Sequence, residues 1–416
     1  MHLIAKLRER GFVPFMVGGA AIFLIVWVVR GERHLFNLFG PHEYWASLWA
    51  SDYRHGFVNR GLLGETLRRL SIDNTNYKVL TLASWAVSLG LFGVILNTLW
   101  RLLKDFDSRL RAGLLVAITL SPAIAGMLIE TMGDPLMLLL LVHVLLAPLL
   151  LGRRQRWLVV GVIYALVGSA MELVHEASVF FFVPWLGVQA FLAQRTPAAR
   201  AAFIGYTLAS LSVVTILVVR GFSVGGGAAP VLHMSGQTYT EQGGLAPPFA
   251  ELLHVELQRM FGHGLSGLLT TACRLIGAAI IPLCLAALLT AARTRTAAVA
   301  LWRNHAIAFL APAICLGPLM LIASDWGRFF SYQFILFLVT LAAMRPSTPQ
   351  EASPNMDWLN LPLFGALVLS GITTTSALRD YRMDGLFANA GIFVACLLLI
   401  GFFAIMTRLS AQKRTG

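Results

Sequence analysis

Charged residues are scarce in this sequence, and their scarcity excludes a water-soluble globular protein. Only 12% of the 416 residues are charged, whereas a soluble domain carries about 25%. The hydrophobic fraction is 57%, and the mean hydropathy is +0.73. A chain of this composition cannot hide its apolar side chains in one core surrounded by water. We therefore expect an integral membrane protein.

Cysteine is also rare, and its placement excludes a disulfide framework. The four cysteines all lie in apolar segments, without the spacing of paired or metal-binding cysteines. We expect them to be small buried residues. No spacing of histidines and carboxylates is diagnostic of a metal either, so no cofactor is predicted, although the carboxylates present would permit a divalent cation.

The sequence lacks the short alternating segments that are typical of a transmembrane β-barrel. It contains long apolar runs instead, near the length of about 20 residues at which a helix crosses a bilayer. Backbone groups in lipid must form their hydrogen bonds within the segment, which requires helices. The sequence predicts an all-α, polytopic transmembrane helical bundle with about 12 spans in one domain, residues 1–416. The predicted spans are 13–30, 79–100, 112–129, 136–151, 157–173, 177–193, 202–219, 264–291, 306–323, 329–344, 359–375 and 387–407.

The net charge of +12 follows from topology rather than from binding to nucleic acid. The basic residues gather in short loops between spans, as the positive-inside rule requires. We therefore expect both termini in the cytoplasm, a bacterial inner-membrane location, membrane lipids as partners and no nucleic acid. Two long loops, 31–78 and 220–263, face the exterior. Within the second, residues 249–261 predict an amphipathic helix, either interfacial or packed on the protein surface.

The first external loop contains the densest group of reactive side chains. Asp52, Arg54, His55 and Arg60 lie close together among aromatic residues and glycines in residues 44–64. Arginine suits phosphate or carboxylate, and a carboxylate beside it can act as a general base toward a hydroxyl. The alternative is an ordinary interfacial loop in which the tryptophans anchor the chain and Asp52 pairs with an arginine.

A second feature is the turn before the fourth predicted span. Asp134 precedes Pro135 at a helix start, which is a strong N-cap pattern. Glu130 lies at the outer end of the preceding span. Capping alone accounts for Asp134 equally well.

A third feature is the segment between the fifth and sixth spans. Glu172, His175 and Glu176 have the spacing that places them on one helical face. Ionisable groups at membrane depth indicate a site, although an interhelical hydrogen bond is an alternative. A zinc peptidase motif is excluded, because the second histidine of HExxH is replaced by Val179.

The last feature is a set of arginines on the outer side, where topology gives no reason for them. Asp325 and Arg328 lie in a short turn between two spans, and Arg220 ends the seventh span. Two interpretations are open: Asp325 and Arg328 pair with each other, or Arg328 binds a phosphate. The outer arginines together predict an anionic, membrane-borne substrate.

This layout resembles the GT-C superfamily of integral membrane glycosyltransferases. The resemblance rests on the long first external loop with Asp52, on residues 133–141 entering the fourth span, and on the short basic loop 153–156. It implies a polyprenyl-phosphate-linked sugar donor, a glycan or lipid acceptor and catalysis on the outer face, with Asp52 as the loop-one carboxylate. The chain departs from the family in two places. Tyr53 follows Asp52 where members carry a second acid, and His175-Glu176 stands where many carry lysine.

The sequence therefore predicts a membrane glycosyltransferase of cell-envelope or exopolysaccharide synthesis. The expected catalytic residues are Asp52, His175 and Glu176. The expected substrate- and phosphate-binding residues are Arg54, Arg60, Arg220, Asp325, Arg328, Asp134, Glu130 and Glu172. Two alternatives are a polysaccharide polymerase or ligase acting on polyprenyl-diphosphate-linked repeat units, and a transporter or flippase for a lipid-linked or anionic solute.

Overall fold

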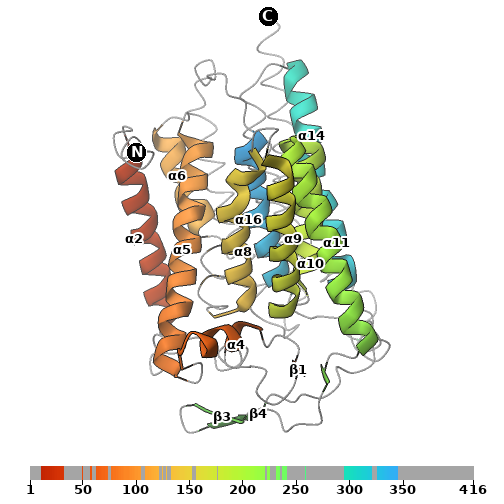
Figure 1. The fold of residues 1–416 in the computed structure, drawn as a ribbon. Coiled ribbons are helices and arrows are strands. Elements are labelled where there is room, and N and C mark those ends of the chain that lie inside the picture. The colour runs from red at the N-terminus through yellow and green to blue at the C-terminus, as the bar shows by residue number, and fades with distance from the viewer. Residues whose placement is uncertain are drawn as a thin grey trace, which may run out of the picture.

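In the part of the chain that this computed structural model describes, most residues lie in long helices packed side by side (Figure 1). The structure describes residues 11–31, 49, 57–58, 62–73, 76–104, 108–120, 124, 128, 133–151, 156–175, 177–220, 223–224, 231–234, 237–240, 258, 295–320 and 326–344. The described helices are α2 Phe12–Gly31, α4 Leu62–Arg69, α5 Tyr77–Leu103, α6 Ser108–Leu120, α8 Pro135–Leu146, η3 Ala147–Leu151, α9 Trp157–Val174, α10 Ser178–Val188, η5 Gln189–Ala193, α11 Pro197–Arg220, α14 Arg295–Cys315, α15 Gly317–Met320 and α16 Trp326–Met344.

These helices coincide, wholly or in part, with every predicted span that falls within the described residues. The predicted spans 264–291, 359–375 and 387–407 lie outside them. Among the described residues, three helical segments can cross a membrane by length and composition, namely Lys78–Leu103, Trp157–Val174 and Pro197–Ile216. Shorter apolar helices are Phe12–Leu24, Pro135–Leu151, Ser178–Ala193 and Ser331–Met344. The structure thus supports a membrane helical bundle, and the number of twelve spans stays a prediction.

The surface of the bundle is apolar, as a lipid-facing surface must be. Leu82, Leu166, Leu208 and Ile314 on four different helices are 71%, 67%, 64% and 73% exposed. Polar side chains such as Thr340 are buried instead. At the centre lies α16, which contacts α5, α8, α10 and α14. An apolar surface around a largely apolar core with some buried polar groups is typical of a bundle whose solvent is lipid.

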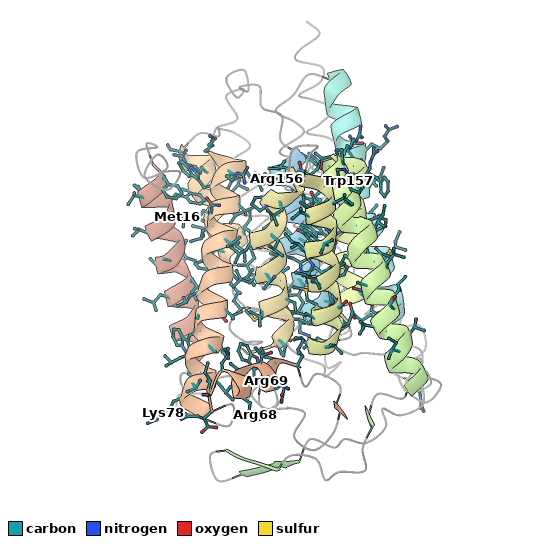
Figure 2. All side chains as sticks on the ribbon, in the orientation of Figure 1. Met16, Arg68, Arg69, Lys78, Arg156 and Trp157 are labelled. Atoms are coloured by element: carbon teal, nitrogen blue, oxygen red, sulfur yellow. The ribbon has the colours of Figure 1, made fainter. Side chains whose placement is uncertain are left out.

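The helices alternate in direction between two ends of the bundle (Figure 2). Met16 and Arg156 lie at one end, and Arg69 and Lys78 lie at the other. We call the latter the α4 end, because α4 crosses it (Figure 1). Helix α9 begins at the opposite end and runs toward α4, which it contacts. The side chains at the end of α9 therefore lie at the α4 end.

Four short strands lie in the long loops, outside the helical bundle. Strand β1, Phe57–Val58, pairs antiparallel with β2, Ser223–Val224. Strands β3, Val231–Met234, and β4, Gln237–Thr240, form a hairpin. A two-residue Ser-Gly connection between β-prone residues is a hairpin signal that hydropathy alone overlooks. The first pair joins the two long loops to each other.

Helices α9 and α11 approach each other closely through small residues. A Cβ atom on Gly205 would overlap the carbonyl oxygen of Gly161. A Cβ atom on Gly161 would lie 3.3 Å from the carbonyl oxygen of Ala201. Ala201 and Gly205 are four residues apart, so they form one small strip on α11, the usual device for close packing of helices in lipid.

We predict that Gly205→Ala lowers the free energy of unfolding by about 1–3 kcal/mol, because the added methyl group forces α9 and α11 apart. Reversible unfolding in mixed micelles measures this change. The matched control is Gly93→Ala on α5, where a Cβ atom meets nothing within 4 Å. The control should be neutral or slightly stabilising, and equal effects at the two positions would contradict the close packing.

Candidate functional site

The carboxylate of Asp134 accepts three hydrogen bonds, from two different helices. It caps α8 by accepting a hydrogen bond from the backbone nitrogen of Leu136 at 2.9 Å. Arg328 donates to its other oxygen, with Nη1 at 3.1 Å, and the hydroxyl of Tyr332 donates to that same oxygen. Asp134 is fully buried. The predicted N-cap is confirmed, and the residue also has two partners that capping does not require.

Both of those partners come from the first turns of α16. Arg328 and Tyr332 are four residues apart and therefore lie on one face of the helix. The Arg328 side chain is only 11% exposed, and its Cζ lies 5.2 Å from the centre of the Phe329 ring. The sequence suggested Asp325 as its partner, but Asp325 lies outside the described residues. The partner in the structure is Asp134, because packing of α8 against α16 brings the two helix starts together.

Trp49 connects the first long loop to this cluster. Its indole nitrogen donates a hydrogen bond to the carbonyl oxygen of Gly133, directly before Asp134. Gly133 has a φ of +90°, a conformation that favours glycine. Trp49 is 3% exposed, so it is a buried anchor rather than an interfacial belt residue. The predicted residues Asp52, Arg54 and Arg60 of this loop lie outside the described residues.

A second buried carboxylate, Glu172, lies near the end of α9. The Ser178 hydroxyl at the start of α10 donates to Glu172 Oε1. The Tyr206 hydroxyl of α11 donates to Ser178 Oγ at 3.4 Å. All three residues are fully buried. The chain of hydroxyl groups therefore ties three helices to one carboxylate at the α4 end.

His175 does not share a helical face with Glu172 in the way that the spacing predicted. Helix α9 ends at Val174, and the backbone of His175 is extended, with φ −161° and ψ 115°. Its Nδ1 accepts a hydrogen bond from the backbone nitrogen of Ala177 at 3.2 Å. The ring thus supports the turn into α10, which interrupts the helical repeat. Glu176, the third member of the predicted group, lies outside the described residues.

Helix α10 lies next to both carboxylate groups, through Ser178 and Phe181. Phe181, one turn beyond Ser178, packs against both Phe329 and Tyr332, with ring centres 5.6 Å and 5.9 Å apart respectively. Tyr332 in turn donates to Asp134. The structure therefore assembles predicted residues from α8, α9 and α16 around one helix. Glu130 and the side chain of Arg220 lie outside the described part of the chain.

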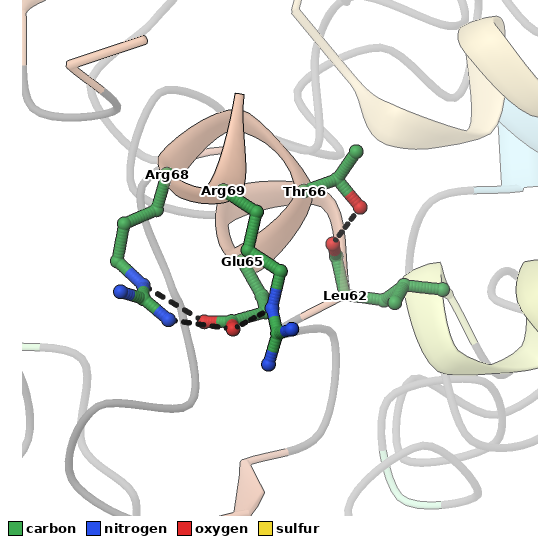
Figure 3. A network of polar contacts seen from close by, with 5 residues as sticks. All are labelled: Leu62, Glu65, Thr66, Arg68 and Arg69. Atoms are coloured by element: carbon green, nitrogen blue, oxygen red, sulfur yellow. Dashed lines mark hydrogen bonds and ion pairs between the residues drawn. The ribbon is translucent and has the colours of Figure 1, made fainter. Parts of the chain in front are cut away.

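Sequence reasoning missed the polar face of α4 altogether. Figure 3 shows Glu65 between Arg68 and Arg69. These hydrogen bonds lower the pKa of Glu65 to about 2, so its carboxyl is ionised at neutral pH. The spacing of the three charges, three and four residues apart, was a helical signal. The amphipathic helix predicted at 249–261 lies outside the described residues apart from Gln258, which is helical.

His143 is a further buried ionisable group that the sequence did not single out. It lies in α8, nine residues after Asp134, or about 14 Å along the helix. Its ring stacks on Phe182 with centres 3.5 Å apart, and Tyr206 meets it edge-on at 5.2 Å. Nδ1 lies 3.0 Å from the carbonyl oxygen of Leu139, so Nδ1 carries the proton. Among the described residues, no three His, Cys, Asp or Glu side chains are grouped to hold a metal ion.

We predict that Ser178→Ala lowers the free energy of unfolding by about 1–3 kcal/mol, because a buried carboxylate loses its hydroxyl donor. Ser212→Ala is the matched control, since the exposed Ser212 hydroxyl only bonds Leu208 of its own helix. The control should stay within about 0.5 kcal/mol of the wild type. Equal stability of the two variants would show that Ser178 does not support Glu172.

Comparison with known proteins gives one result. Residues 17–231, more than half of the chain, match the protein family described as "Uncharacterised membrane protein Rv1490". No curated protein and no solved structure matches the chain.

Proposed function

The chain belongs to the family of the membrane protein Rv1490, and we propose that it is a glycosyltransferase using a polyprenyl-phosphate-linked sugar. The observation that carries the proposal is the buried cluster of Asp134, Arg328 and Tyr332 beside the first long loop. An arginine fixed by a buried carboxylate at the end of a membrane bundle is placed to meet a lipid-borne phosphate.

Preorganisation is the physical reason for giving Arg328 this role. Its guanidinium group is fixed by Asp134 and lies over the ring of Phe329. A cation fixed before the substrate arrives needs no reordering as charge develops on the leaving phosphate. The hydrogen bond of Trp49 to Gly133 ties the first loop to the same helix start, and Asp52 follows Trp49 by only three residues.

The proposed reaction is a single displacement at the sugar. Asp52 accepts the proton of an acceptor hydroxyl, whose oxygen attacks the anomeric carbon of the donor. The bond from that carbon to the phosphate oxygen breaks, and polyprenyl phosphate leaves with the bonding electrons. Arg328, with Arg54 or Arg60, offsets the negative charge of the leaving group. His175 and Glu176 orient the acceptor.

The distribution of basic residues supports placing this chemistry on the exterior side. Helix α5 begins at the α4 end and closes at the opposite end with Arg101 and Lys104, both exposed. Arg156, before α9, is exposed at that opposite end as well (Figure 2). Positive charge marks the cytoplasmic side of membrane proteins. The α4 end, with its cluster around Asp134, then faces the exterior of an inner membrane.

One observation favours transport as a second candidate function. His143 and Glu172 are both buried within the bundle, and ionisable groups at membrane depth often mark a pathway for ions or solutes. In a transporter these side chains would bind or relay charge without any chemical change in the solute. The two candidates therefore differ in whether a covalent product forms.

We predict that the purified protein in liposomes transfers labelled sugar from polyprenyl-phosphate-linked hexose or pentose donors to acceptors in added cell-envelope extract. Asp52→Asn should abolish transfer, and Arg328→Gln should lower it about 100-fold, the cost of losing one donor to a developing charge. Chromatography of the labelled products measures both effects. A single added sugar supports the proposal, whereas a ladder of repeat units would favour polymerisation.

The matched controls make the same two types of substitution at positions away from the cluster. They are Asp73→Asn, at a residue shortly after α4, and Arg303→Gln, at an exposed residue of α14. Both should retain wild-type transfer, and all four variants must give the wild-type elution profile. Full activity of Asp52→Asn would remove the assigned base. Uptake of an unaltered solute without any labelled product would support the transporter instead.

A further inference from the structure

Helix α4 lies across one end of the bundle and has an apolar face and a charged face (Figure 1). Leu62, Leu63 and Leu67 pack against the hydrophobic core. Glu65, Arg68 and Arg69 share the other face, because their spacing of three and four residues places them one above the other. The helix is therefore apolar toward the bundle and charged on the opposite side.

The charged face has a specific geometry (Figure 3). Arg68 donates twice to Glu65, from Nε at 3.0 Å and from Nη2 at 2.6 Å. Arg69 donates from Nε at 2.6 Å. The Glu65 side chain is 7% exposed, while the side chains of Arg68 and Arg69 are 40% and 76% exposed. The carboxylate thus lies beneath two guanidinium groups and fixes them side by side, with an excess of one positive charge.

Stability alone gives little reason for this arrangement. Ion pairs of exposed arginines contribute little to folding, since water screens the attraction and the side chains lose freedom. Two guanidinium groups held next to each other also repel. Such an arrangement is useful when an anion binds across both of them, because their planar N–H groups match phosphate oxygens.

The surroundings of the cluster place it at the level of lipid headgroups. Leu70, directly after Arg69, is 65% exposed. On α5, Leu82 is 71% exposed and lies one turn beyond Lys78, which is about 6 Å along the helix. On α5, the lipid-facing apolar surface therefore begins one helical turn from Lys78, which lies at the α4 end. Leucines toward the bundle and arginines at the surface are the composition of an interfacial helix.

We propose that Glu65, Arg68 and Arg69 form a binding site for the phosphate of an anionic lipid headgroup in the leaflet at the α4 end. The two guanidinium groups bind the phosphate, Glu65 holds them in register, and the apolar surface of Leu70 and Leu82 accommodates the acyl chains. The site is separate from the cluster around Asp134 and does not depend on glycosyl transfer.

The experiment is a titration of the detergent-solubilised full chain with short-chain phosphatidylglycerol, followed by native mass spectrometry of the first bound lipid. Arg69→Gln should raise the Kd about tenfold, as expected for one lost charge-assisted hydrogen bond. Arg69→Lys keeps the charge and the Glu65–Arg68 pair but loses the planar fork, so it should also bind more weakly. Arg200→Gln, an exposed arginine at the start of α11, should match the wild type.

Glu65→Gln gives the sharpest test, because the two explanations of lipid binding predict opposite changes in the affinity for the anionic lipid. The variant adds one positive charge, so general electrostatic attraction predicts tighter binding of the anionic lipid. The proposed site predicts binding weaker by about threefold, because the guanidinium groups lose the carboxylate that preorganises them. Equal or tighter binding would overturn the proposal. Competition by glycerol phosphate at equal concentration would also overturn it, since the ligand would then be a soluble phosphate.

Discussion

A carboxylate buried at the start of α8 is the constraint on which the α4 end of this bundle depends. Asp134 caps its own helix, accepts from Arg328 and Tyr332 of α16, and lies next to the carbonyl group that holds Trp49. An ionised group in so apolar a place is stable only when its hydrogen bonds are satisfied. The position of α8 against α16, and the docking of the first loop, follow from that requirement.

The same physical argument explains why polar residues gather at this end. Lipid surrounds the bundle between its ends, and polar groups there must be buried, as His143 is, with its Nδ1 bonded to the carbonyl oxygen of Leu139. Near the headgroups, polar groups need not be buried, and charged groups such as Arg69 extend outward. The cluster around Asp134 and Arg328 lies between these two environments, and for that reason the proposed function assigns to it a substrate that is lipid at one end and polar at the other.

The sequence predicted the helices well because the bilayer imposes their length on the apolar runs. It predicted the cap at Asp134 from local chemistry, since Asp before Pro defines a helix start. It did not predict the pairing of Asp134 with Arg328, which depends on contacts between residues 194 positions apart. The predicted helical face of Glu172 and His175 was wrong, because the spacing of charges says nothing about where a helix ends. Helix α4 was missed because eight residues contribute little to a hydropathy profile.

The most direct test of this account is a double-mutant cycle on Asp134 and Arg328. Asp134→Asn keeps an acceptor for the helix cap, and Arg328→Met keeps the bulk of the side chain without its charge. Unfolding in mixed micelles should show a loss of about 3 kcal/mol for each single variant, because each leaves a buried charge unpaired. The double variant should lose little more than either one. Additive losses would show that the two residues do not interact, and would contradict the account of the α4 end.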